Sequence, residues 1–219
     1  MNDPGPSVGV ATARGRPLCV KICGIVRVAD AAAAIESGAD LIGLNFHPAS
    51  PRYIAPESAA AIVRMLPRYV LAAGIFVDPD PDCVRRAVEM TGIALIQFHG
   101  HETREFCHSF GLPVLKALRV ARLAELAQAA AAYPGDWVLA DTADPIRGGG
   151  TGRALPLEPV APDLARRLFL AGGLTPESVA AAVRALRPLG VDVCSGVELR
   201  PGAKDPVRLR NFVHNAKTA

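Results

Sequence analysis

The sequence has no long hydrophobic run and no large excess of charge, and these two absences exclude several classes of function. No apolar stretch approaches the ~20 residues that a transmembrane helix requires, and residues 1–17 lack the apolar segment of a secretory signal. The formal net charge of the 219 residues is only +3, which is too small to indicate nucleic acid or a membrane as a partner. We expect a cytoplasmic protein. Residues 1–17 are rich in Gly, Pro and Ser and are predicted to be a disordered tail.

Disulfide frameworks and common cofactor motifs are absent as well. The five cysteines are odd in number and include no Cys-x-x-Cys pair, so we expect free thiols. His99, His101, Cys107 and His108 match no standard set of zinc ligands, and we predict no metal. No G-x-G-x-x-G follows the first strand-like segment, and the glycines of residues 148–152 precede no Gly-Lys-Ser/Thr of a phosphate-binding P-loop. We therefore expect no cofactor.

What the chain does have is a regular alternation of strand-like and helix-like segments. The predicted strands are residues 18–23, 40–46, 70–77, 93–98, 113–118, 136–141, 167–171 and 190–194. The predicted helices are residues 28–37, 56–66, 81–90, 102–110, 121–132, 157–165, 176–187 and 205–216. Eight such repeats predict an α/β fold, a single (β/α)8 barrel over residues 18–219, because alternating elements give parallel strands joined by crossovers.

Local signals at the helix ends support these boundaries. Asp80-Pro81 and Thr175-Pro176 each place a capping side chain before a proline that suits the first position of a helix. Glycines can end helices because they adopt left-handed backbone angles. Four glycines lie where the predicted helices should stop: Gly38, Gly92, Gly111 and Gly190.

In such a barrel the active site lies over the carboxyl ends of the strands, which directs attention to Cys23 and Asp141. Cys23 shares a strand face with Lys21, although a lone cysteine is more often a buried core thiol. Asp141 ends an apolar strand and is predicted to point into the barrel mouth. The structural alternative for Asp141 is a salt bridge to an inward lysine, either Lys21 or Lys116. Cys23 and Asp141 are predicted to face each other across a ligand as a base and an acid.

Glycine-bearing loops after the last two barrel strands predict a phosphate site. Gly172 and Gly173 follow residues 167–171, and Ser195 and Gly196 follow residues 190–194. Glycine allows backbone N–H groups to approach an anion closely, and this pair of loops is the usual phosphate cradle of the fold. The alternative is that these glycines only make tight turns.

Three further loops or strand ends carry candidate binding groups. Gly150 lies in the flexible glycine stretch, which is interpreted as a lid hinge or a second wall of the phosphate site. Arg52 follows the rigid Pro48 and Pro51 and suits a carboxylate, although it is also compatible with a surface position. Gln97 and His99 are predicted to line the site, with a structural hydrogen bond as the equal alternative for His99.

Several ordered motifs together resemble the phosphoribosylanthranilate isomerase family of tryptophan biosynthesis over residues 18–216. The motifs are Lys21-Ile22-Cys23-Gly24, Ser50-Pro51-Arg52-Tyr53, Gln97-Phe98-His99-Gly100, Leu139-Ala140-Asp141-Thr142, Leu170-Ala171-Gly172-Gly173-Leu174 and Ser195-Gly196-Val197-Glu198. The resemblance implies an Amadori rearrangement of a phosphosugar substrate, with Cys23 as general base and Asp141 as general acid. It also implies that Arg52 binds the anthranilate carboxylate, and that the protein is a monomer or a homodimer.

Two other functions fit the same pattern. One is a different phosphosugar barrel enzyme, such as an indoleglycerol-phosphate synthase or the histidine-pathway isomerase, which has an aspartate where Cys23 stands. The other is a barrel that binds a phosphate ligand without catalysis. For the isomerase, we hypothesise that Lys21 lowers the pKa of Cys23, because an adjacent ammonium favours the thiolate.

Overall fold

The computed structural model describes residues 17–142 and 158–219 of the chain. The predicted tail and Gly150 lie outside the described residues. The main sheet contains β1 (Cys19–Ile22), β2 (Leu41–Asn45), β3 (Leu71–Phe76), β4 (Leu95–Phe98), β5 (Val114–Val120), β6 (Trp137–Thr142), β7 (Leu168–Leu170) and β8 (Gly190–Val193). The helices are α1 (Val28–Glu36), α2 (Pro56–Met65), α3 (Pro81–Thr91), α4 (Arg104–His108), α5 (Leu123–Ala130), α6 (Pro162–Ala165), α7 (Val179–Leu186) and α8 (Pro206–Lys217).

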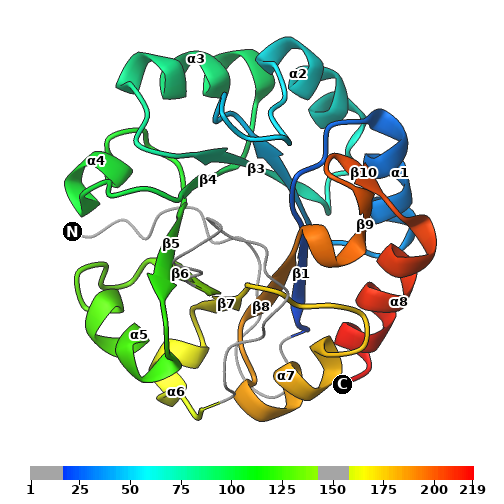
Figure 1. Cartoon of the computed structure of the whole chain (residues 1–219). Coiled ribbons are helices and arrows are strands. Elements are labelled where there is room, and N and C mark those ends of the chain that lie inside the picture. The colour runs from blue at the N-terminus through cyan, green and yellow to red at the C-terminus, as the bar shows by residue number, and fades with distance from the viewer. Residues whose placement is uncertain (1–16, 143–157) are drawn as a thin grey trace.

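The eight strands form a closed parallel barrel in sequence order, as the sequence predicts. The helices form a ring outside it, and α8 lies beside α1, so the two ends of the barrel meet (Figure 1). β1 and β8 close the barrel in a parallel register that places Lys21 opposite Asp192. Among the described residues, no helix is long and apolar enough to cross a membrane.

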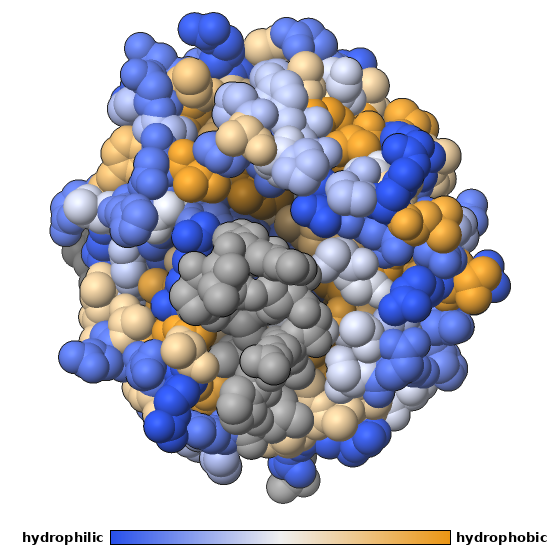
Figure 2. All heavy atoms as spheres, in the orientation of Figure 1, coloured by the Kyte–Doolittle hydropathy of each residue, from blue (hydrophilic) through white to orange (hydrophobic). Residues whose placement is uncertain are grey.

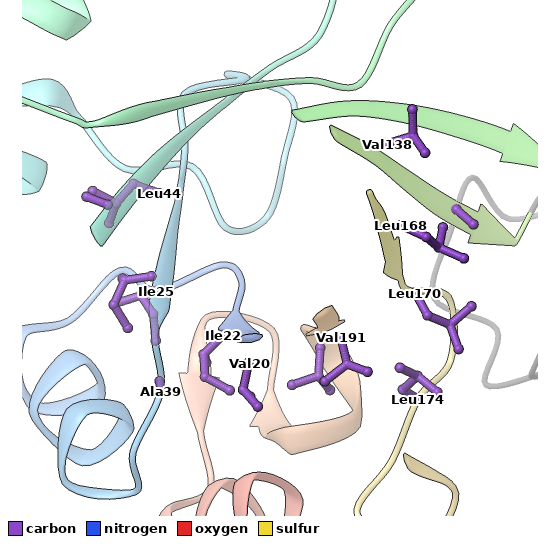
Figure 3. Close-up of a cluster of buried hydrophobic side chains, with 14 of the residues drawn as sticks. Val20, Ile22, Ile25, Ala39, Leu44, Val138, Leu168, Leu170, Leu174 and Val191 are labelled. Carbon is purple, nitrogen blue, oxygen red and sulfur yellow. The ribbon is translucent and has the colours of Figure 1, made fainter. Parts of the chain in front are cut away.

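Two apolar clusters hold the barrel together. The inner one fills the barrel with side chains such as Leu41, Leu95, Leu139 and Phe169. The outer one packs the opposite faces of the strands against the helices, and Figure 3 shows Val20, Ile22 and Val191 meeting there from β1 and β8. Because successive strand residues point to opposite faces, this division fixes which side chains point inward. Charged and polar residues mix with apolar ones around the rim (Figure 2).

The local cap signals predicted some boundaries and failed at others. Asp80 caps α3 by accepting a hydrogen bond from the Asp82 N–H at 2.8 Å, and Gly92 ends that helix with a φ of 68°. The prediction that Thr175-Pro176 begins a helix is wrong. The Thr175 carbonyl accepts from the N–H groups of Ser178 and Val179 in a turn that leads directly into α7, and α7 itself begins only at Val179.

Three other predicted boundaries also need correction. Gly190 is the first residue of β8 and does not end a helix. The helix predicted over residues 157–165 is only the four residues of α6. β5 continues to Val120, two residues beyond the predicted strand end at Leu118.

A small hairpin after β8 was not predicted. A 3-10 turn, η1 (Ser195–Val197), leads into β9 (Glu198–Arg200), which pairs antiparallel with β10 (Ala203–Lys204). Asp205 then caps α8, accepting from the Val207 N–H at 2.8 Å. The hairpin matters for the site because it carries Glu198 and Lys204 to the mouth of the barrel.

Candidate active site

A cavity of about 470 Å³ opens over the carboxyl ends of the strands. This volume is in the range of ligand sites in proteins. Every predicted site residue that the structure describes lines it: Cys23, Arg52, Gln97, His99, Asp141, Gly172, Gly173, Ser195 and Gly196. Strand ends from both sides of the ring thus bring a thiol, a carboxyl group and a guanidinium to one cavity.

Cys23 lies directly after β1, at the seam where the barrel closes. Its N–H donates to the Val193 carbonyl at 2.9 Å, which continues the β1–β8 register and places Cys23 beside Cys194. A hydrogen bond from the Cys194 thiol and the charges of Lys21 and Lys204 lower the pKa of Cys23 to about 6, although burial acts in the opposite direction. The pKa of Cys194 is raised well above its usual value by that same hydrogen bond and by burial.

The hypothesis that Lys21 lowers the pKa of Cys23 is therefore right in direction but incomplete. The hydrogen bond from Cys194 is the larger cause, and Asp192 opposes both. Lys21 is itself fully buried, two residues before Cys23 on the same face of the chain, and its Nζ lies 2.7 Å from Asp192 Oδ1. Burial alone would lower the pKa of Lys21, but Asp192 and Cys23 outweigh it and raise the pKa, so the ammonium is retained.

Asp141 points into the cavity from the end of β6, as its strand parity predicts. Its Oδ2 lies 3.1 Å from His99 Nε2, and Gln97 Nε2 lies 3.2 Å from His99 Nδ1. His99 thus lies between Gln97 and Asp141, with one ring nitrogen within hydrogen-bond distance of each side chain. The expected alternative, a salt bridge from Asp141 to Lys21 or Lys116, is not what forms.

Lys116 points away from the barrel interior. Its Nζ contacts Glu102 Oε2 and the Gly100 carbonyl, both at 2.7 Å. The residue that shares a layer with Asp141 is Arg119, which pairs with it in the β5–β6 register and lines the cavity. Sequence reasoning missed Arg119 because the predicted strand ended at Leu118. Continuing the alternation of Leu115 and Ala117 by one step would have found it.

Arg52 is held in the cavity wall by Glu198. The Arg52 Nε donates to Glu198 Oε1 at 2.9 Å, and its Nη2 donates to Oε2 at 2.7 Å. Lys204 Nζ also contacts Glu198 Oε1, at 3.0 Å. Burial raises the pKa of Glu198, but Arg52 and Lys204 outweigh it and keep that pKa below its usual value. This bidentate pair fixes the plane of the guanidinium group. The other edge of the group, formed by Nη1 and Nη2, can still donate to another ligand.

The glycines of the two last loops are structurally required. Gly172 and Gly173 have φ values of 79° and 72°, a region that residues with a Cβ rarely adopt. A Cβ on Gly196 would collide with the Leu174 carbonyl oxygen of the neighbouring loop. After β1, next to the β8 loop, a Cβ on Gly24 would lie 2.6 Å from Arg52 Cδ and 2.9 Å from Cys194 Sγ. Among the described residues, no group of three His, Cys, Asp or Glu side chains could hold a metal ion.

The fold and the cavity define the class of this protein, which is a (β/α)8-barrel enzyme with its site at the carboxyl ends of the strands. The family model described as N-(5'phosphoribosyl)anthranilate (PRA) isomerase matches residues 20–215. The chain belongs to this family, and it is an isomerase of tryptophan biosynthesis. The resemblance inferred from its motifs is thereby confirmed.

Individual relatives and solved structures agree with this family. The N-(5'-phosphoribosyl)anthranilate isomerase of Trichlorobacter lovleyi is 44% identical over 202 residues, covering 91% of this chain and 98% of the relative. The crystal structure of the Thermotoga maritima enzyme has a TM-score of 0.82 at 37% identity, covering 92% of this chain and 100% of that one. A second structure, a phosphoribosyl anthranilate isomerase in complex with reduced 1-(o-carboxyphenylamino)-1-deoxyribulose 5-phosphate, has a TM-score of 0.79 at 37% identity, with the same coverage.

Proposed function

We propose that Cys23 and Asp141 carry out the proton transfers of the family's reaction. In this Amadori rearrangement, N-(5-phosphoribosyl)anthranilate becomes 1-(2-carboxyphenylamino)-1-deoxyribulose 5-phosphate. The observation that carries the proposal is that a thiol whose pKa is lowered to about 6 and a carboxyl group line one cavity from strands β1 and β6. A base of this pKa is ionised at neutral pH, as proton abstraction from carbon requires.

The chemistry follows from these two positions. Asp141, in its protonated form, donates to the furanose ring oxygen as the bond from that oxygen to C1′ breaks, and the anilino nitrogen supplies the electron pair that gives a protonated Schiff base. The Cys23 thiolate then removes the proton from C2′, and the C–H electrons form the enolamine. Tautomerisation of the enolamine to the ketone completes the reaction. His99 holds the Asp141 carboxyl group in the cavity while this occurs.

The remaining groups of the cavity fit the two charged ends of such a substrate. The free edge of the Arg52 guanidinium suits the anthranilate carboxylate, since Glu198 occupies the other edge. The loops at Gly172, Gly173, Ser195 and Gly196 line the cavity, and backbone N–H groups in such glycine loops suit the phosphate of the substrate. Gln97 Oε1 is buried without a hydrogen-bond partner in the described part of the chain and is available to a substrate hydroxyl or water.

The test follows the fluorescence of the anthranilate group of the substrate, which should decay after freshly prepared phosphoribosylanthranilate is mixed with the purified chain. Cys23→Ala and Asp141→Asn should each reduce kcat by at least about 100-fold, since each removes one proton transfer. Both variants should bind the reduced product analogue with nearly unchanged affinity. Full activity in either variant would refute the assignment of that residue. Fluorescence that never decays with the parent chain would instead favour a barrel that binds without catalysis.

We also propose a cytoplasmic location and a monomeric or homodimeric state. All five cysteines are free, which suits a reducing compartment. A related structure from Thermotoga maritima describes monomers generated from a dimeric enzyme, so both states are reasonable in this family. Light scattering on the purified chain would distinguish them, and a larger assembly would contradict the proposal.

A further inference from the structure

Two cysteines lie side by side at the mouth of the cavity, on the two strands that close the barrel. The β1–β8 register pairs Lys21 with Asp192 and Ile22 with Val193, so the next position pairs Cys23 with Cys194. Both side chains line the same cavity, and Cys194 is the neighbour that lowers the pKa of Cys23 most. Neighbouring strands are about 4.7–4.9 Å apart, which lies within the Cα separation of about 4.4–6.8 Å that disulfides span. The backbone therefore already has a spacing that a disulfide accepts.

This pair differs from the other three cysteines of the chain. Cys19 and Cys107 are held by burial at a pKa of about 12 each, and such thiols are inert. Cys83 is exposed on α3, away from the cavity lining. Cys23 and Cys194 both line the cavity and are partly exposed, so a small oxidant that enters the site reaches them. Of the five cysteines, these two are the ones that share a cavity and lie on neighbouring strands.

We propose that Cys23 and Cys194 are a redox modification site, at which a hydroperoxide converts the two thiols into a reversible disulfide that closes the active site. The Cys23 sulfur attacks one peroxide oxygen, the O–O bond breaks, and the product is a sulfenic acid with hydroxide leaving. The Cys194 sulfur then attacks the Cys23 sulfur, the S–O bond breaks, and a second water forms once the thiol proton is transferred. In sum, two thiols and one hydrogen peroxide give one disulfide and two waters.

The surroundings of Cys194 favour its role as the second thiol. Lys204 Nζ lies 3.8 Å from the Cys194 sulfur, and its charge lowers the pKa of that thiol, whereas burial and the Cys23 thiolate raise it. Oxidation of Cys23 to a sulfenic acid removes the Cys23 thiolate, so that the ammonium then favours the Cys194 thiolate that resolves the sulfenic acid. The Cys194 thiol also donates a hydrogen bond to Glu198 Oε1 at 3.9 Å, which holds its sulfur in the cavity wall. Without a second thiol in contact, Cys23 would proceed from sulfenic to sulfinic acid, which is irreversible. The pair thus converts a destructive oxidation into a reversible one.

The experiment treats the purified full-length chain with a small molar excess of hydrogen peroxide and follows intact mass and isomerase activity. Wild type should lose about 2 Da, the mass of two hydrogens, together with activity, and dithiothreitol should restore both. Peptide mapping without reduction should find Cys23 linked to Cys194. The control Cys83→Ser removes the exposed thiol and should behave as wild type.

Cys194→Ser and Cys194→Ala keep Cys23 but remove its partner, and circular dichroism establishes that each is folded. In both variants peroxide should add about 32 Da to Cys23, and dithiothreitol should not restore activity. The inference is overturned if wild type shows only added oxygen, or if Cys194→Ser regains activity as wild type does. The mass readout does not depend on the catalytic role of Cys23. A Cys23–Cys194 disulfide in a fully active protein would refute both the closure of the active site by the disulfide and the role of Cys23 as the base.

Discussion

Replacing Cys194 with alanine should raise the pKa of Cys23 and reduce its reactivity at neutral pH. The hydrogen bond from Cys194 is the largest contribution that lowers this pKa to about 6, while burial pulls it upward. At pH 7 a thiol of pKa 6 is about 90% ionised, whereas one at the ordinary value of 9.0 is about 1% ionised. Lys21 and Lys204 remain in the variant, so we expect the pKa of Cys23 to lie between these two values, at least about one unit above that of wild type.

The assay is the rate of Cys23 alkylation by iodoacetamide across pH 5 to about 10, with the labelled peptide quantified by mass spectrometry. Cys194→Ser is the matched control, because its hydroxyl retains a hydrogen-bond donor in the same place. The serine variant should keep a midpoint close to that of wild type, and the alanine variant should not. Equal midpoints in wild type and Cys194→Ala would refute the idea that this thiol sets the ionisation of Cys23. The acid limb of kcat/KM should shift in the same direction as alkylation.

Two further substitutions test the supports of the site. Lys21→Met leaves Asp192 buried without its partner, so the free energy of unfolding measured in urea should fall by about 3–5 kcal/mol. The double variant Lys21→Met/Asp192→Leu should recover most of this loss, because it leaves no buried charge unpaired. An unchanged urea midpoint in Lys21→Met would contradict the expected loss of stability. As a control, Lys217→Met removes a surface ion pair and should cost under about 1 kcal/mol. Glu198→Gln weakens the bidentate hydrogen bonds to Arg52 and should raise KM roughly ten-fold, with a smaller change in kcat. Steady-state kinetics measure both constants, and an unchanged KM would show that Glu198 does not position Arg52 for the substrate.

The barrel was predictable because its signal repeats along the whole chain. Along each buried strand, successive side chains point alternately into the barrel and toward the helices. In β1, Val20 and Ile22 point toward the helices, and Cys19 and Lys21 point into the barrel. Cap signals are weaker, because tertiary contacts override them. The turn at Thr175 is an example. The Thr175 carbonyl accepts a hydrogen bond from Val179, the first residue of α7, but Pro176 is not itself in a helix.

The same parity predicted the positions of Cys23 and Asp141, but it could not predict their partners. His99, just after β4, contacts Asp141 on β6, and Glu198 contacts Arg52 from a hairpin that was not predicted. Such contacts depend on the curvature of the closed sheet and on loop paths, neither of which leaves a local sequence pattern. Cys194 was visible at the end of a predicted strand. Its role emerged only when the register placed it beside Cys23.

The register between β1 and β8 links the chemistry to the completion of the fold. It places Lys21 against Asp192 in one inward layer and Cys23 against Cys194 in the next, and a shift of one residue would turn all of these side chains out of the barrel. These are the first and last strands of the barrel, so their pairing joins the two ends of the chain. A chain with the barrel open at this seam has no thiol donor beside Cys23 and loses the largest cause of its lowered pKa. The base therefore exists only in the closed barrel, and fast alkylation of Cys23 at neutral pH reports that closure directly.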